Sequence, residues 1–286
     1  MIGDESVTAS LLGAATAHPR LHWDLLVLAP IGALVAIYVR RFRSARAQDG
    51  GRGAGAAHAC AFAAGVLALI AALATPLDGL GEDYLFSAHM LQHVLLGDVA
   101  PILLLLSLSR VIMRPATRRL MRVERALGPL ASPWTGIVIW LGLMYLWHLP
   151  VMYEAALANA FVHVLEHACF FTAGLAVWWP LVAPVPMRRR LAGLWIIAYI
   201  GTAKFGLAAL GLYLTWSGDV LYEHYAGAPR IWGISAINDQ NAGGAIMMIE
   251  QSLTFVIALA VLFGRMLVQS EADELRRERL EERAAL

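Results

Sequence analysis

Long, unbroken apolar runs are the feature that most limits how this chain can fold. A helix needs about 17–25 mostly apolar residues to cross the hydrocarbon of a bilayer, and several runs of that order are present. The runs are continuous rather than alternating, so they predict helices instead of strands, and a spanning helix satisfies its own backbone groups. The composition agrees, because 59% of the 286 residues are hydrophobic and only 15% are charged, which is too apolar for an ordinary soluble domain.

We expect seven membrane-spanning helices in one all-α bundle, with the fourth run shorter than most of the others. Residues 1–268 would form this transmembrane domain, including a short external N-terminal tail. Residues 269–286 mix both charge signs at helical spacing and would form a cytoplasmic helical tail. The expected spans are residues 23–41, 57–75, 85–107, 134–147, 160–182, 191–215 and 242–268.

The arginines predict how the bundle is oriented. They are dense after the first run, between the third and fourth runs, and at residues 188–190, whereas only Arg20 and Arg230 fall on the other side. Because positively charged loops stay in the cytoplasm, we expect the N-terminus outside and the C-terminus in the cytoplasm. An odd number of spans requires the same arrangement, which the net charge of +1 conceals.

Histidines gather in the outer half of the expected bundle. "HMLQH" in the third run and "HVLEH" in the fifth share the pattern His-x-x-Gln/Glu-His, on helices expected to run in the same direction. Residues at i, i+3 and i+4 share one helix face, and polar side chains at membrane depth turn toward the bundle interior because facing lipid is costly. We therefore expect two polar stripes to face each other, namely His89, Gln92 and His93 with His163, Glu166 and His167.

Further candidate residues are expected at a similar depth. His148 ends the fourth run on the external side, while Met247 and Glu250 lie near the start of the seventh. Asp239 is expected at the external mouth. Imidazole suits copper, zinc and iron, and thioether neighbours select cuprous copper. The expected metal ligands are His89, His93, His163, His167, His148 and Met247, and the residues expected to orient them or to line the access route are Glu166, Asp239, Gln92 and Glu250.

The other chemistry-bearing residues are few. Cys60 and Cys169 form neither a disulfide framework nor a C-x-x-C motif, which argues against a thiol-based redox protein. Lys204, the only lysine, falls within the sixth run, and we expect it to pair with Glu166 or Glu250 because intramembrane charges tend to pair. The sequence has no phosphate-binding loop, nucleophile motif or nucleic-acid patch, so we expect no catalytic residue and no nucleic-acid partner.

The residues alone leave several functions open. The histidines could hold copper in a non-enzymatic binding protein, or bind haem axially in an electron-transfer cytochrome of the membrane. They could also hold zinc in a membrane hydrolase, with Glu166 or Glu250 as the base. Helix packing through hydrogen bonds is a further role. A transporter would need a polar path through the cytoplasmic half, where we note only His58 and Lys204.

Three segments together resemble a known family. They are "AHMLQHVLLGDVAPILLLL", "WHLPVMYEAALANAFVHVLEHACFFTAGLAVWWPL" and "DQNAGGAIMM", and they are similar to the integral-membrane CtaG family of cytochrome c oxidase assembly factors. The resemblance covers roughly residues 20–268. It implies a non-enzymatic, multi-pass protein of the bacterial plasma membrane that helps copper reach a haem-copper oxidase. It assigns the family's motifs to His89, His93, His148, His163, His167, Asp239, Gln240, Gly243 and Gly244.

The expected function is therefore that of an oxidase assembly factor that binds copper, as Cu(I), in its outer half. Zinc and haem are the alternative cofactors. The expected partners are a haem-copper oxidase subunit or another copper chaperone, besides the lipid bilayer. Gly243 and Gly244 permit close helix contact, either within one chain or between two chains of a homo-oligomer.

Overall fold

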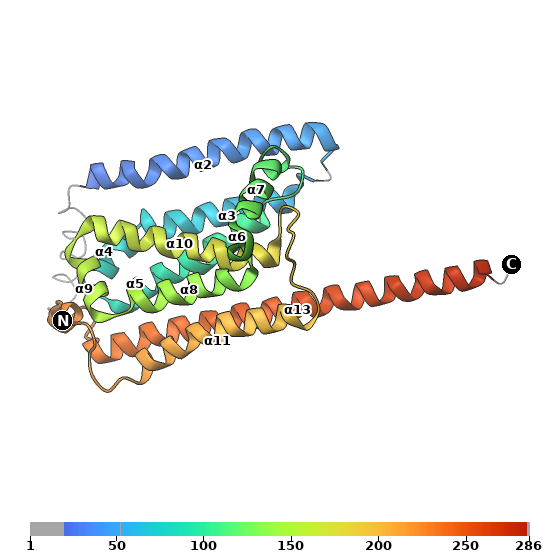
Figure 1. The fold of residues 1–286 in the computed structure, drawn as a ribbon. Coiled ribbons are helices and arrows are strands. Elements are labelled where there is room, and N and C mark those ends of the chain that lie inside the picture. The colour runs from blue at the N-terminus through green and yellow to red at the C-terminus, as the bar shows by residue number, and fades with distance from the viewer. Residues whose placement is uncertain (1–19, 52, 285–286) are drawn as a thin grey trace.

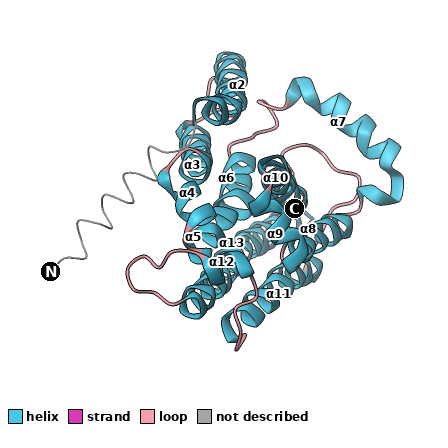
Figure 2. Cartoon of the chain, turned by 90° about the vertical axis from the view of Figure 1, so that its left-hand side faces the viewer, coloured by secondary structure: helices cyan, strands magenta, loops and turns pink. Residues whose placement is uncertain are grey.

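The described residues, 20–51 and 53–284, form a bundle of helices without a strand in the computed structural model (Figure 1). The expected N-terminal tail and residues 285–286 lie outside the described residues. Viewed along the bundle axis, α2 and α3 stand on one side and α11 on the opposite side (Figure 2). The long helices are α2 (Arg20–Asp49), α3 (Ala56–Leu73), α10 (Ala160–Val182), α11 (Leu194–Trp216) and α13 (Ala236–Ala284).

Shorter helices complete the bundle and cap one of its ends. Figure 1 shows α4 and α9 at the end of the bundle where α5 and α10 begin. We call this the α4/α9 end. The shorter elements are α4 (Pro76–Asp83), α5 (Phe86–Val94), η1 (Leu95–Val99), α6 (Ala100–Leu106), α7 (Arg114–Leu127), η2 (Gly128–Ala131), α8 (Pro133–Trp147), α9 (Pro150–Ala158) and α12 (Glu223–Gly227).

The described helices support a multi-pass membrane protein. Five of them are long and apolar enough to cross a bilayer, or six when the bent pair Arg114–Ala131 and Pro133–Trp147 is counted as one span. α2 carries the first expected run but is not among these candidates. The all-helical class is confirmed, whereas the seven spans and the orientation of the termini stay predictions.

The third expected span is interrupted by one turn of π-helix. α5, η1 and α6 follow one another without a gap, and η1 is the π-helical piece. Such a bulge occurs frequently at functional sites. α10 crosses the chain closely here, because a side chain on Gly174 would collide with the backbone oxygen of Gly97. The bulge also contains Asp98, which is buried.

Glycines bring α13 against two other helices of the same chain. A Cβ atom on Gly244 would lie 2.6 Å from the backbone oxygen of Gly211 in α11, which is too close for any residue but glycine. Gly243 faces the ring of Phe86 in α5. The close contact expected of this glycine pair is therefore made within one chain. The charged tail continues α13 without a break through Ala284, and this part extends beyond the bundle (Figure 1).

Candidate metal centre

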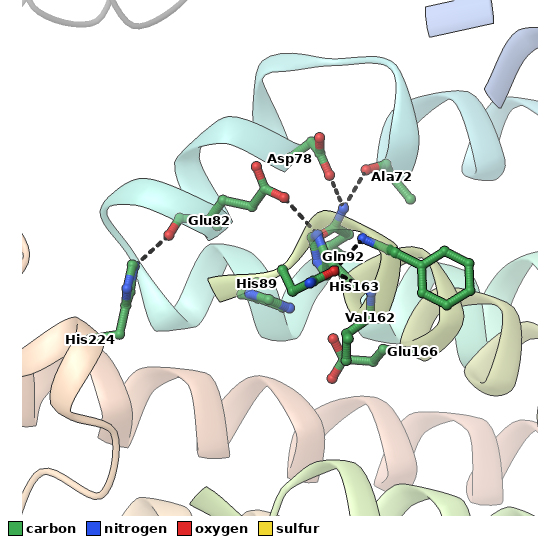
Figure 3. Close-up of polar contacts among 12 residues, drawn as sticks. Ala72, Asp78, Glu82, His89, Gln92, Val162, His163, Glu166 and His224 are labelled. Carbon is green, nitrogen blue, oxygen red and sulfur yellow. Dashed lines mark hydrogen bonds and ion pairs between the residues drawn. The ribbon is translucent and has the colours of Figure 1, made fainter. Parts of the chain in front are cut away.

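α5 and α10 bring the two histidine stripes together near the α4/α9 end of the bundle (Figure 1). Figure 3 shows His89 of one stripe beside His163 and Glu166 of the other. The ring centres of His89 and His163 are 5.3 Å apart, and those of His93 and His167 are 5.7 Å apart. We call these four histidines and Glu166, which lies between His163 and His167 on α10, the histidine group. Two short helical patterns therefore converge on one buried place.

Four side chains of this group direct donor atoms toward one point. Ligand atoms of His89, His93, Glu166 and His167 all lie within 4.8 Å of one another. Donors in a tetrahedral site with bonds of about 2.0–2.1 Å lie roughly 3.4 Å apart, so a small inward movement of these side chains would close them around an ion. Glu166 was expected to act behind the ligands, but its carboxylate stands among the candidate ligands themselves.

Three histidines are oriented through Nδ1 by a hydrogen-bond acceptor. His163 Nδ1 lies 2.6 Å from the carboxylate of Glu82, and His148 Nδ1 lies 2.7 Å from the carbonyl oxygen of Met144. His89 Nδ1 lies 2.9 Å from the hydroxyl of Tyr225. An acceptor at Nδ1 leaves the lone pair of a neutral imidazole on Nε2, and metal-binding histidines are usually held in this way.

Tyr225 serves as an acceptor because its own proton is already committed. Its hydroxyl donates to the carbonyl oxygen of Gly81 at 2.6 Å. Burial raises the pKa of the Tyr225 phenol well above its usual range, so the hydroxyl keeps that proton at neutral pH. The phenol oxygen can then accept the Nδ1 proton of His89.

Many polar atoms of this region are buried and have no hydrogen-bond partner among the described residues. Leaving a buried polar atom unpaired costs about 1–3 kcal/mol, so several in one place require an explanation. Glu166 is only 1% exposed, and neither of its carboxylate oxygens has a hydrogen-bond partner. The other such atoms on the two stripes and on His148 are Gln92 Oε1, His93 Nδ1, His148 Nε2, His163 Nε2 and His167 Nε2.

Two of the predicted site residues make hydrogen bonds that join helices. Gln92 donates to the carbonyl oxygen of Ala72 at 3.0 Å and to Asp78 at 2.5 Å, which ties α5 to α3 and α4 (Figure 3). Asp239 does not lie at an open mouth, since it is 2% exposed and accepts hydrogen bonds from Phe86 N and Ser87 N at 2.6 and 3.2 Å. These N–H groups have no partner within α5, and an acidic side chain is well suited to them.

Glu250 belongs to a second polar centre deeper in the bundle, which we call the lysine group. Lys204 donates to Asp98, which also accepts from Trp178 and, at 3.0 Å, from Gln251. Glu250 accepts from Thr254 at 2.5 Å and from Gln251. Glu250, one of the two partners expected for Lys204, lies 3.9 Å from Lys204 Nζ. The residue that Lys204 contacts directly is Asp98, which was not expected. The lysine group comprises Asp98, Trp178, Lys204, Glu250 and Gln251.

Sequence reasoning missed Asp98, Glu82 and Tyr225. The signal for Asp98 was available, since it is an acidic residue in the middle of an apolar run, "LLGDV". Glu82 and Tyr225 lie outside the expected spans and gave no such signal. Met247 and His148 were expected as ligands, and both line a cavity beside the histidine group together with Met144.

Comparisons with known proteins complete the description. The model of a family described as cytochrome c oxidase caa3 assembly factor (Caa3_CtaG) matches residues 36–269. "Uncharacterized protein ML1998" of Mycobacterium leprae (strain TN) is 24% identical over an alignment of 220 residues, and the match covers 68% of this chain. The chain spans only 32% of the length of that curated relative. No solved structure matches the chain significantly.

Proposed function

The chain belongs to the Caa3_CtaG family of cytochrome c oxidase assembly factors, and we propose that it serves assembly by binding a copper ion in the histidine group and passing it on. The matched region, residues 36–269, contains both histidine stripes and the lysine group. Membership points to a non-catalytic role in a multi-pass membrane protein. The copper ion is then cargo rather than a resident cofactor.

One observation carries the proposal. Buried imidazole nitrogens and a buried carboxylate converge within 4.8 Å, and several of their polar atoms have no hydrogen-bond partner in the described part of the chain. A group with a packing role alone would lose about 1–3 kcal/mol for each such atom. A bound cation would use these lone pairs and remove that cost.

The geometry favours copper over haem. The adjoining cavity has a volume of about 20 Å³, far below what a porphyrin ring needs, and the donors converge on a point instead of flanking a plane. Zinc is the closer competitor, since histidine and carboxylate ligands also suit zinc. The thioether side chains beside the group favour cuprous copper. Metal loading under competition separates these two ions.

The proposed route follows from the expected membrane orientation. Copper would reach the histidine group from the outer face of a bacterial plasma membrane, where the α4/α9 end is expected. The recipient would be a haem-copper oxidase subunit or a second copper chaperone. A carrier must release its cargo, and donor atoms that converge without closing tightly are suited to exchange.

The test is metal loading of the purified protein in detergent. The chain is equilibrated anaerobically with Cu(I), with Zn(II) in competition, and bound metals are measured by elemental analysis beside a visible spectrum. We expect about one copper per chain in wild type and none in a His89→Ala/His93→Ala variant. His58→Ala, in α3 and outside the histidine group, is the matched control and should bind like wild type.

Three outcomes would contradict the proposal. Zinc bound in preference to copper would favour the hydrolase, and a haem absorption band would favour the cytochrome. Copper bound equally by wild type and the double variant would show that the histidine group is not the site. Size-exclusion chromatography of each variant establishes that the comparison is made on folded protein.

A further inference from the structure

A small cavity lies between the histidine group and the lysine group. Its volume of about 20 Å³ is enough for one water molecule or one ion. His93 and His148 line it together with Asp98, Glu250 and Gln251 of the lysine group. The two polar centres therefore share one internal space.

The hydrogen bonds assign a free lone pair to His148. Its Nδ1 lies 2.7 Å from the carbonyl oxygen of Met144, which can only accept, so Nδ1 carries the proton. The lone pair is then on Nε2, which is buried and unpartnered among the residues described. His148 is 6% exposed.

A longer chain of hydrogen bonds makes the same assignment for His93. His89 donates from Nδ1 to Tyr225, so its Nε2 has a lone pair and accepts from His93 Nε2, 2.8 Å away. His93 then carries its own lone pair on Nδ1, which is buried and has no partner in the described structure. Two imidazole lone pairs are thus left unused by residues that line this cavity.

Sulfur completes the lining. Three methionines from three helices line the cavity, namely Met90 of α5, Met144 of α8 and Met247 of α13. All three are buried, at 4% exposure or less. Imidazole together with thioether is a donor set that selects Cu(I) over harder divalent ions. At the deeper end, the carboxyl groups of Asp98 and Glu250 line the cavity, which suits a cation rather than an anion. The ammonium group of Lys204 pairs with Asp98 but does not line the cavity.

We propose that this cavity is a second Cu(I) position, in which His93, His148 and the methionine thioethers hold the ion. The proposal rests on the copper function proposed above and adds to it a second place for the ion. A neutral imidazole offers one lone pair at a time, so His93 serves the outer position through Nε2 or the inner one through Nδ1. One ion therefore occupies one of the two positions.

X-ray absorption at the copper edge tests the inner position directly. The purified full-length chain is loaded anaerobically with one equivalent of Cu(I). We expect wild type to show both nitrogen and sulfur scatterers around copper. In a Met90→Leu/Met144→Leu/Met247→Leu variant the sulfur contribution should fall to background, while about one copper per chain stays bound through nitrogen. Met→Leu conserves volume and is usually tolerated in cores.

Met248→Leu is the matched control. Met248 is the sequence neighbour of Met247, but it lies against α11, where its Sδ is 3.8 Å from the hydroxyl of Thr215. It does not line the cavity, so its replacement should leave the sulfur signal unchanged.

Each result decides between the two proposals. Copper bound by nitrogen and oxygen alone in wild type overturns the inner position and leaves the histidine site intact. Sulfur that persists in the triple variant, or disappears in Met248→Leu, also overturns it. Failure of wild type to bind any copper contradicts the proposed function itself, and the inner position with it. The wild-type spectrum alone decides the case should the triple variant fail to fold.

Discussion

The histidine group and the lysine group are both polar and both buried in a membrane protein. They differ in whether their side-chain atoms have hydrogen-bond partners. In the lysine group the charged atoms have partners, since Lys204 and the carboxylates of Asp98 and Glu250 bond to one another or to nearby donors. Only the neutral amide oxygen of Gln251 is without a hydrogen bond among the described atoms of this group. In the histidine group the carboxylate of Glu166 and several ring nitrogens have no hydrogen-bond partner in the described part of the chain, and the carboxylate comes no closer than 3.9 Å to His93 Nε2. A completed group stabilises the fold, whereas an incomplete one has capacity left for a ligand.

The largest expected effect comes from breaking the completed group. Lys204→Met should destabilise the protein by about 3–5 kcal/mol, because it leaves the buried carboxylate of Asp98 without its counter-ion. The change also removes the contact of Lys204 Nζ with the ring of Trp178, 4.8 Å away. Thermal unfolding in detergent measures the loss. A double variant, Asp98→Asn/Lys204→Met, should recover part of it, and a single variant as stable as wild type would refute the distinction between the groups.

The incomplete group should respond in the opposite way. His167→Gln should change the stability of metal-free protein by less than about 1 kcal/mol, because its Nε2 has no partner to lose among the described residues. Its Cu(I) affinity should fall by more than about 100-fold, roughly 2.7 kcal/mol, since even residues that only orient a ligand contribute 10–100-fold. Competition with a chromophoric Cu(I) chelator measures the affinity. Unchanged binding together with a large loss of stability would mean that the group is structural.

A smaller effect on copper affinity is expected at Tyr225, which both orients His89 and donates a structural hydrogen bond to Gly81. Tyr225→Phe removes the acceptor that orients His89 Nδ1, so Cu(I) affinity should fall by about tenfold, and stability by about 1 kcal/mol. Tyr153→Phe is the control, since its hydroxyl lies 3.4 Å from that of Tyr225 without bonding a histidine. The same chelator competition applies. Equal affinity losses in both variants would indicate general loosening instead of loss of orientation.

Local patterns explain what could be predicted from the sequence. Residues three and four apart share a helix face, so the histidine pairs could be placed on facing stripes without any knowledge of the fold. The lysine group has no such pattern, because Asp98 meets Lys204 and Gln251 across 106 and 153 residues of chain. Hydropathy alone treats Asp98 as a tolerated exception within an apolar run.

The misplaced residues follow the same rule. Asp239 was assigned from its depth on the last helix. Its hydrogen-bond partners, Phe86 and Ser87, belong to α5 and lie 153 and 152 residues earlier in the chain. Glu166 was assigned to orientation because a carboxylate often stands behind a histidine. Only the rotamers and the packing of α5 against α10 decide which atoms face inward.

Asp239 gives the smallest and most specific test. Asp239 lies next to the histidine stripe in space, but its carboxylate already accepts hydrogen bonds from the first N–H groups of α5. In this respect it resembles the carboxylates of the lysine group. Asp239→Asn keeps the shape and removes the charge and one acceptor, so stability should fall by about 1 kcal/mol, the usual scale for a lost helix cap. Copper affinity should stay within about threefold of wild type, less than half of the 1.4 kcal/mol that a tenfold change represents. Unfolding and chelator competition on the same preparation measure both quantities. A variant of normal stability that no longer bound copper would support the expected role of Asp239 in copper access. It would also show that a side chain in this bundle can have all its hydrogen bonds and still not be purely structural.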